Sequence, residues 1–358
     1  MKPKRLLMIS TDRKLLEEGS AVRVRHAAYA KEWDEVHIIV YAKRHLNLAQ
    51  KSEILNPKQA RNQKFEEVET ETTIAPNCWA YSTRSRLKGM NAFGAIRLGR
   101  FIISQRGITD ITCQDPFMTA IAASSLKKRF PELKWEIQVH TDVGSPNFSY
   151  TIGNRIRRSL ALTHLPRADK IRVVSGRIKT FLTEKLGIAA SKIEVRPIVV
   201  DTSFITSAPI TVDLHKKYPH FKKIVLMASR LEAEKNISLA LNSLPIVLKA
   251  IPNAGLVIVG SGGRAYSLKA KAHRLGIGSS AVFESWADKV ELASYYKTAD
   301  AFLSTSLYEG YGLTFVEAKA AGCLIVSTDV GVAREMGANI VEWNKESVAR
   351  GIIGIISK

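Results

Sequence analysis

The stretch STSLYEGYGLTFVEAKAAG, residues 304–322, decides the fold of the second half of the chain. A short apolar run precedes it, as expected for a buried strand. Gly310 and Gly312 then bracket a turn, and from Leu313 apolar residues recur every three or four positions, which predicts a helix. Gly322 ends that helix, and another apolar run follows. The pattern predicts a strand, a glycine turn and a helix, as in an α/β sheet domain.

Two carboxylates occur in this stretch, Glu309 in the turn and Glu317 about one turn inside the helix. Free N–H groups and the positive end of the helix dipole suit a phosphate at such a turn. A carboxylate is repelled by phosphate, but it can accept hydrogen bonds from hydroxyl groups on either side of it. Phosphate flanked by polyols describes a nucleotide-sugar. The alternative is a surface glutamate and a capping glutamate, because short motifs often match by chance.

Apolar strand candidates alternate with helix candidates along the rest of the chain. This alternation predicts an α/β fold with parallel sheets that carry helices on both faces. Residues 201–222 contain Pro209 and Pro219 and show no clear period, so we expect the linker near the start of this segment. We therefore predict a domain at 1–204 and a second domain at 205–358.

The composition is that of a protein with sizeable cores, with 358 residues of which 46% are hydrophobic. Cys78, Cys113 and Cys323 have neither metal-ligand spacing nor a disulfide pattern, which favours a reducing cytoplasm. The apolar run after the basic N-terminus is too short for a signal peptide. No apolar run approaches the length of about 18 residues that a membrane-spanning helix needs. We expect a cytoplasmic protein.

Positive charge is concentrated in the first half. Residues 1–200 carry 35 Lys and Arg against 19 Asp and Glu, a net charge of +16, whereas residues 201–358 carry 18 against 14, a net charge of +4. Such a field attracts phosphates of nucleic acid, lipid or substrate without choosing among them. Residues 84–106 combine basic side chains with an apolar stripe. They fit either a helix with a solvated basic face or a contact with a membrane surface.

The segment EGYGLTFVEAKAAG resembles the E-x(7)-E segment of retaining glycosyltransferases of family 4, which have the GT-B fold. Three other segments agree with that family. ASRL followed by EKN, from Ala228, resembles the opening of its second domain; LVIVGSG, from Leu256, resembles its strand-to-glycine turn; and VRPIVVD, from Val195, resembles its interdomain junction. The resemblance covers nearly all of residues 170–345 and is loose over 1–150. It implies two Rossmann-like parallel-sheet domains that face each other across a cleft.

The resemblance also implies roles for the charged residues. Arg230 and Lys235 would converge on the donor diphosphate and stabilise the charge that develops on it, Arg as a fork and Lys as a point charge. Glu309 would hold hydroxyl groups of the donor sugar, and Glu317 those of the ribose. Two exposed surface cations are the alternative for Arg230 and Lys235. The anomeric configuration would be retained, and no residue identifies itself as a nucleophile.

Five further positions complete the predicted site. Gly19 and Ser20 follow the first strand and would face the donor phosphates, although an ordinary strand-to-helix turn has the same pattern. His140 follows another strand and matches a histidine close to the donor sugar, or it is structural. Gly260 lies in a glycine run that is weak evidence alone. Trp286 could lie by the base, whereas burial is the usual role of a tryptophan.

In full, the predicted catalytic residues are Glu309, His140, Arg230 and Lys235. The predicted donor-binding residues are Gly19, Ser20, Arg230, Lys235, Gly260, Trp286, Glu309, Gly310, Tyr311, Gly312, Leu313 and Glu317. Because the sequence has no Asp-x-Asp motif, we expect neither a metal nor another cofactor.

The match departs from the family in two places. Ser285-Trp286 stands where the family commonly has a glycine, which puts base recognition in doubt. Family members also continue with a helix that crosses back to the first domain, and that helix is absent before Lys358. We expect either a fragment or looser docking of the domains.

The leading hypothesis is therefore a metal-independent retaining hexosyltransferase that uses a nucleoside-diphosphate sugar. The charge of the first half predicts a lipid-linked or phosphorylated acceptor and peripheral contact with the inner membrane face. The alternative is a non-enzymatic basic protein that binds anionic membrane or nucleic acid. No recognition helix, zinc spacing or aromatic RNA motif supports nucleic acid. An NAD-dependent enzyme does not fit the glycine spacing.

Overall fold

The computed structural model describes residues 3–42, 71–85 and 87–357 of the chain. These residues form two compact units. Unit 1 comprises the described residues within 1–140, 152–173 and 183–194, and unit 2 comprises the described residues within 141–151, 174–182 and 195–358. The predicted boundary between residues 204 and 205 falls inside a helix of unit 2, Thr202–Ser207 (α6); the division into domains there stays a prediction.

Unit 1 is built on a sheet with the strand order β3-β4-β2-β1-β5-β6-β7-β8. The pairs formed by β1, β2, β4, β5, β6 and β7 are parallel, and β3 runs antiparallel to β4. The strands are β1 Arg5–Ser10, β2 Glu35–Val40, β3 Glu71–Ala75, β4 Cys78–Ser82, β5 Asp110–Cys113, β6 Lys134–Val139, β7 Lys170–Val173 and β8 Ile193–Val195.

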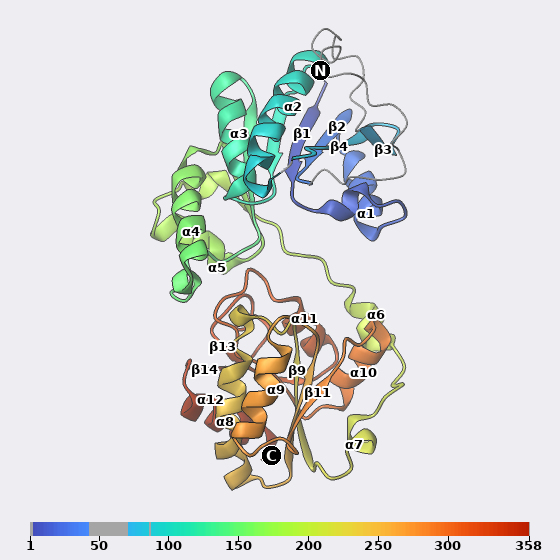
Figure 1. Ribbon diagram of the computed structural model, residues 1–358, viewed down its shortest axis with the longest axis vertical. Helices are drawn as coiled ribbons and strands as arrows, with labels where there is room; N and C mark the ends of the chain where they lie inside the picture. Colours follow the sequence, from blue (N-terminus) through green and yellow to red (C-terminus); the bar gives the residue numbers. More distant parts are fainter. Residues whose placement is uncertain (1–2, 43–70, 86, 358) are drawn as a thin grey trace. The chain divides into compact units, whose positions relative to one another are not determined.

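Helices lie on both faces of this sheet, as its alternating pattern predicts (Figure 1). Alternate apolar residues of β1, such as Leu6 and Met8, pack with Val22 and Ala30 of α1 on one face. Helices α2 and α3 pack against strands of the same sheet and against each other. The helices of this part of the sequence are α1 Ala21–Ala30, α2 Asn91–Arg106, α3 Met118–Arg129, α4 Ile152–His164 and α5 Gly176–Glu184.

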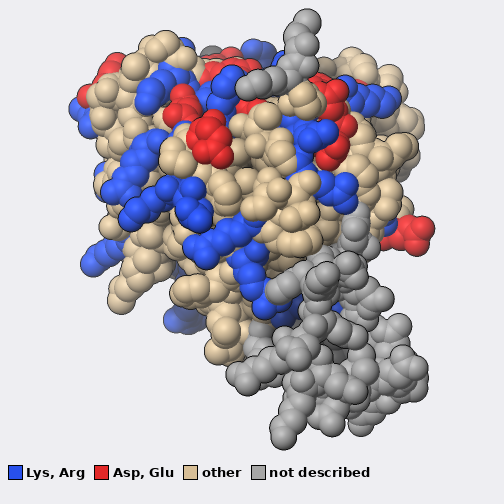
Figure 2. All heavy atoms as spheres, turned by 90° about the horizontal axis from the view of Figure 1, so that it is seen from above, with Lys and Arg blue, Asp and Glu red and all other residues tan. Residues whose placement is uncertain are grey.

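The basic segment predicted at 84–106 is only partly helical. Helix α2 begins at Asn91 and is preceded by a short 3-10 turn, Lys88–Met90, while Arg86 lies outside the described residues. Leu87 and Phe93 are 66% and 73% exposed, so apolar and basic side chains share this surface. Figure 2 shows one face of the molecule, where Lys and Arg side chains gather in a band.

Unit 2 contains a second sheet with the order β11-β10-β9-β12-β13-β14, and its strand pairs are parallel. The strands are β9 Lys223–Ala228, β10 Ala254–Val259, β11 Ala281–Glu284, β12 Ala301–Ser304, β13 Leu324–Thr328 and β14 Asn339–Val341. Besides α6, the helices that follow are α7 Leu214–Lys217, α8 Ile237–Ala250, α9 Ala265–Arg274, α10 Lys289–Thr298, α11 Leu313–Ala320 and α12 Lys345–Ile356.

The cores of unit 2 lie on opposite faces of this sheet. Val225 and Met227 of β9 pack with residues of α8, α9 and α12, whereas Leu226 of β9 packs with Tyr296 of α10 and Phe315 of α11. Successive side chains of a strand point to opposite faces, so a continuous apolar run serves both cores. Because the strands are parallel, the loops after β9, β10, β12 and β13 emerge at one edge of the sheet, where ligands bind in open α/β sheets. Among the described residues, no helix is both long and apolar enough to cross a membrane.

Candidate active site

The turn after β12 and the loop after β9 are joined at this edge by backbone and side-chain bonds. The N–H of Leu307 donates to the carbonyl of Glu234 at 2.8 Å, and the hydroxyl of Thr305 donates to the carbonyl of Asn236 at 3.0 Å. Asn236 has a φ of 46° and links the short 3-10 turn Ala233–Lys235 to α8. The two segments therefore occupy fixed positions next to each other.

Lys235 and Glu309 form an ion pair at this junction. The Nζ of Lys235 lies 2.5 Å from Oε1 of Glu309, and each side chain is only 17% exposed. The hydroxyl of Ser306 donates to the same oxygen at 2.8 Å. The pair joins Lys235, which is predicted to bind the diphosphate, to Glu309, which is predicted to bind the sugar, and the two residues stand 74 positions apart in the sequence. A cation and an acceptor of hydroxyl hydrogen bonds thus lie at one point.

The turn itself carries unused hydrogen-bond donors. In the part of the chain that the structure describes, the N–H groups of residues 310–313 have no acceptor. Gly312 has a φ of 87°, and a Cβ there would lie 2.5 Å from the ring of Phe315, so glycine is required both by conformation and by space. Helix α11 begins at the next residue, and its dipole adds to the attraction of the free N–H groups for an anion.

Arg230 forms an ion pair with a neighbouring carboxylate. Its Nη2 lies 2.8 Å from Oε1 of Glu234, and its side chain is 67% exposed. An exposed ion pair of this kind contributes little to stability, so the guanidinium can exchange partners at small cost. Arg230 stays a predicted ligand, with Glu234 holding it in the absence of one.

Glu317 lies on α11 and is partly buried. The hydroxyl of Tyr296 donates to its Oε2 at 3.1 Å. Burial raises the pKa of Glu317, while the Tyr296 hydrogen bond and the charge of Lys289 act in the opposite direction. The carboxyl group is therefore already oriented by one donor, and its other oxygen accepts no hydrogen bond from the residues that the structure describes.

Gly260 has a packing role in the structure, and the predicted contact of Trp286 with the base stays a prediction. Gly260 has a φ of 140°, and a Cβ there would lie 2.0 Å from the carbonyl oxygen of Ser229. Its N–H donates to the carbonyl of Glu284, so Gly260 brings three strand ends together and offers no free donor. Trp286 follows β11 and is 67% exposed, and the usual burial of tryptophan is wrong for it.

The remaining predicted residues lie in unit 1. Gly19 has a φ of 72°, and Ser20 caps α1 by accepting the N–H of Arg23. His140 follows β6 and stays exposed, with its Nε2 at 3.3 Å from Oε1 of Gln138. Partial loss of solvent around the ring and then the charges of Arg172 and Arg25 lower the pKa of His140 to about 4, so the ring is neutral at neutral pH.

Sequence reasoning assigned no role to Ser306 and Gly331, and it included Glu234 only as part of the EKN motif. Ser306 stands three positions before Glu309, a spacing that suggests a side-chain contact. Gly331 follows β13 as Gly260 follows β10, and it packs against the carbonyl of Tyr311. Among the described residues, no group of three or more His, Cys, Asp or Glu could hold a metal ion. The expectation that no metal is required stays a prediction.

The family model described as Glycosyl transferases group 1 matches residues 213–353, which include every predicted site residue of unit 2. The match covers less than half of the chain, and over these residues the chain is similar to that family. The predicted resemblance is thereby confirmed at the level of a group 1 glycosyltransferase with the GT-B fold, and the assignment to family 4 stays a prediction.

Curated relatives agree with the family. Alpha-monoglucosyldiacylglycerol synthase of Streptococcus pneumoniae is 38% identical over 106 residues, which are 30% of this chain and 24% of that protein. The GDP-mannose-dependent alpha-(1-6)-phosphatidylinositol monomannoside mannosyltransferase of Mycobacterium tuberculosis is 30% identical over 176 residues, 47% of this chain and 46% of that protein. The matches thus span from about a quarter to about half of these relatives' lengths.

Solved structures show the fold over nearly the whole chain. The sucrose-phosphate synthase of Thermosynechococcus elongatus has a TM-score of 0.72 at 17% identity and covers 99% of this chain and 90% of its own. HepE of Anabaena, solved in complex with UDP, has a TM-score of 0.66 at 15% identity and covers 99% of this chain and 90% of its own. These likenesses establish two parallel-sheet units of the GT-B fold.

Proposed function

We propose that this protein is a retaining glycosyltransferase that moves a sugar from a nucleoside-diphosphate sugar to an acceptor. The observation that carries the proposal is the Lys235–Glu309 pair, which lies beside the free N–H groups at the start of α11. A cation and several N–H donors suit a diphosphate, and a neighbouring carboxylate suits a sugar hydroxyl. The solved structures of HepE with UDP and of an Escherichia coli protein with UDP-2-fluoro glucose support a nucleotide ligand.

An enzyme that catalyses such a transfer has to stabilise the negative charge that develops on the leaving diphosphate. Lys235, Arg230 and the N–H groups of the turn would stabilise it without waiting for solvent to reorganise, and one such donor is worth roughly 3 kcal/mol of transition-state stabilisation. When a diphosphate binds Lys235, Glu309 loses a partner and becomes available to the donor sugar. Glu317 would hold ribose hydroxyl groups. In this scheme the cations act in place of a metal ion.

The acceptor is the less defined substrate, and we propose that it is lipid-linked or phosphorylated. The net charge of +16 on residues 1–200 has no use with a neutral sugar. The names of the two relatives above contain monoglucosyldiacylglycerol and phosphatidylinositol monomannoside, and poly(glycerol-phosphate) appears in the name of another, from Bacillus subtilis. The exposed Leu87 and Phe93 beside basic residues would let unit 1 rest on the inner face of an anionic membrane.

A non-enzymatic basic protein is the second candidate, and the same exposed surface favours it. Thermal unfolding with UDP, GDP, ADP and NADH separates the two. The proposal predicts that one nucleoside diphosphate raises the Tm, because at a concentration of 100 times Kd it adds about 2.7 kcal/mol to the free energy of unfolding. EDTA should change neither this Tm shift nor the turnover. If no diphosphate shifts the Tm, or if manganese restores an enzyme that EDTA inactivates, the proposed site is wrong.

Membrane contact has its own test, in co-sedimentation with anionic and zwitterionic liposomes at low and high salt. We expect binding to anionic vesicles at low salt only, and weaker binding of Phe93→Asp. Tyr266→Asp in unit 2 is the matched control, because Tyr266 is 87% exposed and lies on α9. Equal and negligible binding to both kinds of vesicle at low salt would rule out the membrane contact.

A further inference from the structure

The turn that carries Glu309 is held from one side by the segment after β13. The hydroxyl of Thr328 donates to the carbonyl of Ser306 at 2.7 Å, and the N–H of Val332 donates to the carbonyl of Tyr311 at 2.9 Å. Between these bonds Gly331, with a φ of 51°, lies so close that a Cβ would be 2.2 Å from the Tyr311 oxygen. The position of residues 328–332 therefore determines the position of the turn.

A second segment reaches the turn from the other side. Residues 141–151 follow β6 of unit 1 in sequence, yet they belong to the compact unit that contains the turn. The hydroxyl of Ser145 donates to the carbonyl of Leu307 at 3.1 Å, and Phe148, 1% exposed, packs edge-on against Tyr308 with ring centroids 5.0 Å apart. Ser145 is set in place by Asp142, because its N–H donates to the Asp142 carbonyl at 3.4 Å.

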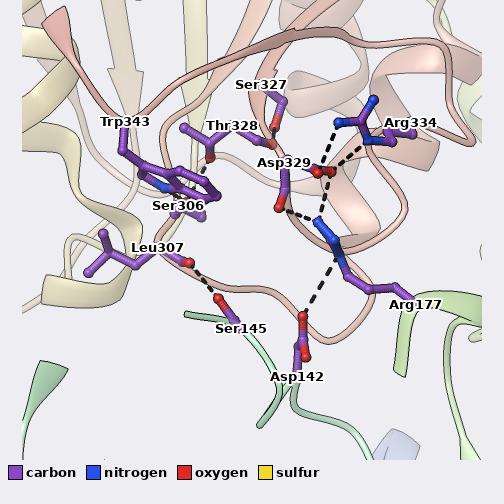
Figure 3. A network of polar contacts seen from close by, with 10 residues as sticks. All are labelled: Asp142, Ser145, Arg177, Ser306, Leu307, Ser327, Thr328, Asp329, Arg334 and Trp343. Carbon is purple, nitrogen blue, oxygen red and sulfur yellow. Dashed lines mark hydrogen bonds and ion pairs between the residues drawn. The ribbon is translucent and has the colours of Figure 1, made fainter. Parts of the chain in front are cut away.

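Arg177, on the first turn of α5, joins these two segments (Figure 3). Its Nη2 lies 2.8 Å from Oδ1 of Asp329 and donates to the Asp329 carbonyl at 2.5 Å. Its Nε lies 3.8 Å from Oδ2 of Asp142. A planar guanidinium can engage acceptors on two sides at once, which the single ammonium of lysine cannot do with the same geometry.

These contacts close into a ring around the base of the turn. The ring runs through Asp142, Arg177, Asp329, Thr328, Ser306, Leu307 and Ser145 (Figure 3). Arg334 binds Asp329 from outside the ring, with its Nε and Nη2 each 3.0 Å from a carboxylate oxygen. Of these seven residues Arg177 alone carries a positive charge, and it lies between the carboxylates of Asp142 and Asp329.

We propose that Arg177 is a positioning residue, which fixes the turn of Glu309 by bridging Asp142 and Asp329. Asp142 is only 4% exposed, so without Arg177 its carboxylate has to stay charged in a buried place, take up a proton or move out. Each response displaces the segment of Ser145 and, through Leu307, the turn. A displacement of about 1 Å can cost roughly a hundredfold in rate at a catalytic centre, and this effect on sugar transfer rests on the proposed function.

Hydrogen exchange tests the positioning role without any ligand. The amides of Leu307 and Val332 donate to the carbonyls of Glu234 and Tyr311 and therefore report on how firmly the turn is held. In Arg177→Met, both amides should exchange at least about fivefold faster than in the unaltered protein. Arg334→Met is the matched control, because it removes a cation from Asp329 and leaves the ring closed; its exchange rates should stay within about twofold. Equal rates for these amides in the two variants would overturn the proposal.

Two substitutions keep the test valid if Arg177→Met does not fold. Asp142→Asn preserves an acceptor for Arg177 but removes the charge, and Arg177→Lys preserves the charge but not the fork. Both substitutions should accelerate exchange at the Leu307 amide. If Arg177→Met folds, Arg177→Lys should accelerate it less than Arg177→Met does. Unchanged exchange in Asp142→Asn and Arg177→Lys would contradict a positioning role.

Turnover of a nucleoside-diphosphate sugar gives the second readout. Arg177→Met should lower kcat by at least about tenfold, Arg177→Lys should restore part of it, and Arg334→Met should leave it within about twofold. Faster exchange in a protein that neither binds a diphosphate nor transfers sugar would uphold the role of Arg177 and refute the proposed function. Normal kcat in Arg177→Met would refute the role in catalysis.

Discussion

The turn that leads from β1 to α1 and the turn that leads from β12 to α11 both pass through a glycine with positive φ, and both are predicted to face the donor phosphates. The first is held by its own neighbours in sequence. Ser20 accepts the N–H of Arg23 and donates to the carbonyl of Lys14, and no residue that the structure describes lies within 4 Å of a Cβ placed on Gly19. The hydrogen bonds at Ser20 are thus local, although Leu15 earlier in the same connection is buried in the core of unit 1.

The second turn is held by residues far away in sequence. Lys235, Ser145 and Thr328 all bond to residues 306–309, and Gly331 leaves no room for a methyl group beside Tyr311. Such a turn can keep a carboxylate and a cation fixed at a chosen separation, whereas the first turn can supply only a helix N-terminus and a hydroxyl group. The difference predicts that chemistry depends on the second turn and that the first assists binding.

The largest contrast should come from alanine at the two glycines. Gly331→Ala adds a strained φ, at about 1–2 kcal/mol, to a steric clash of about 1–3 kcal/mol, whereas Gly19→Ala carries only the strain. We expect losses of roughly 2–5 and 1–2 kcal/mol in the free energy of unfolding, measured with urea. Equal losses would mean that the second turn is no more tightly packed than the first.

Glu309→Gln should lower kcat by roughly a hundredfold, about 2.7 kcal/mol, with the donor Kd within about threefold. The amide keeps an acceptor for Lys235 and Ser306 but loses the charge. Steady-state kinetics with the donor that the thermal screen identifies give both constants. Turnover at the unaltered rate would remove Glu309 from the mechanism.

Ser20→Ala should cost about 1 kcal/mol of stability, because it removes the N-cap of α1. Since Ser20 also stands at the helix N-terminus, we expect a fall in diphosphate affinity of no more than about fivefold. Asp288→Ala is a matched control, since Asp288 caps α10 in the same way. A loss of affinity as large as that caused by altering Lys235 would give the two turns equal roles.

Glu317→Gln should change the pH dependence of the free energy of unfolding more than its magnitude at any one pH. Because burial raises the folded pKa of Glu317, its contribution is fully present below the unfolded pKa and is lost as pH rises through the folded value. The Tm of Glu317→Gln relative to the unaltered protein should therefore increase from pH 4 to pH 7. A Tm difference that stays constant with pH would show that burial does not raise the pKa of this carboxyl group.

These contrasts also explain what could be predicted from the sequence. The glycine turn between β12 and α11 was predictable because local periodicity and glycine determine it. The pairing of Lys235 with Glu309 was not, because only the parallel order β9-β12 brings the two loops together. The same holds for Arg177, whose partners Asp142 and Asp329 stand 35 and 152 positions away. The burial alternative for Trp286 was wrong because composition says nothing of a strand end that opens to solvent, and its predicted place by the base stays a prediction.

Calorimetric titration of UDP, GDP and ADP into the unaltered protein and into Lys235→Met tests the central claim most directly. The account predicts that one diphosphate binds and that Lys235→Met lowers its affinity by about tenfold or more, because a charge-assisted hydrogen bond of roughly 1.5–3 kcal/mol is lost. The corresponding nucleoside should bind both proteins equally. Diphosphate affinity that is unchanged in a folded Lys235→Met variant would contradict the placement of the donor phosphates at this turn.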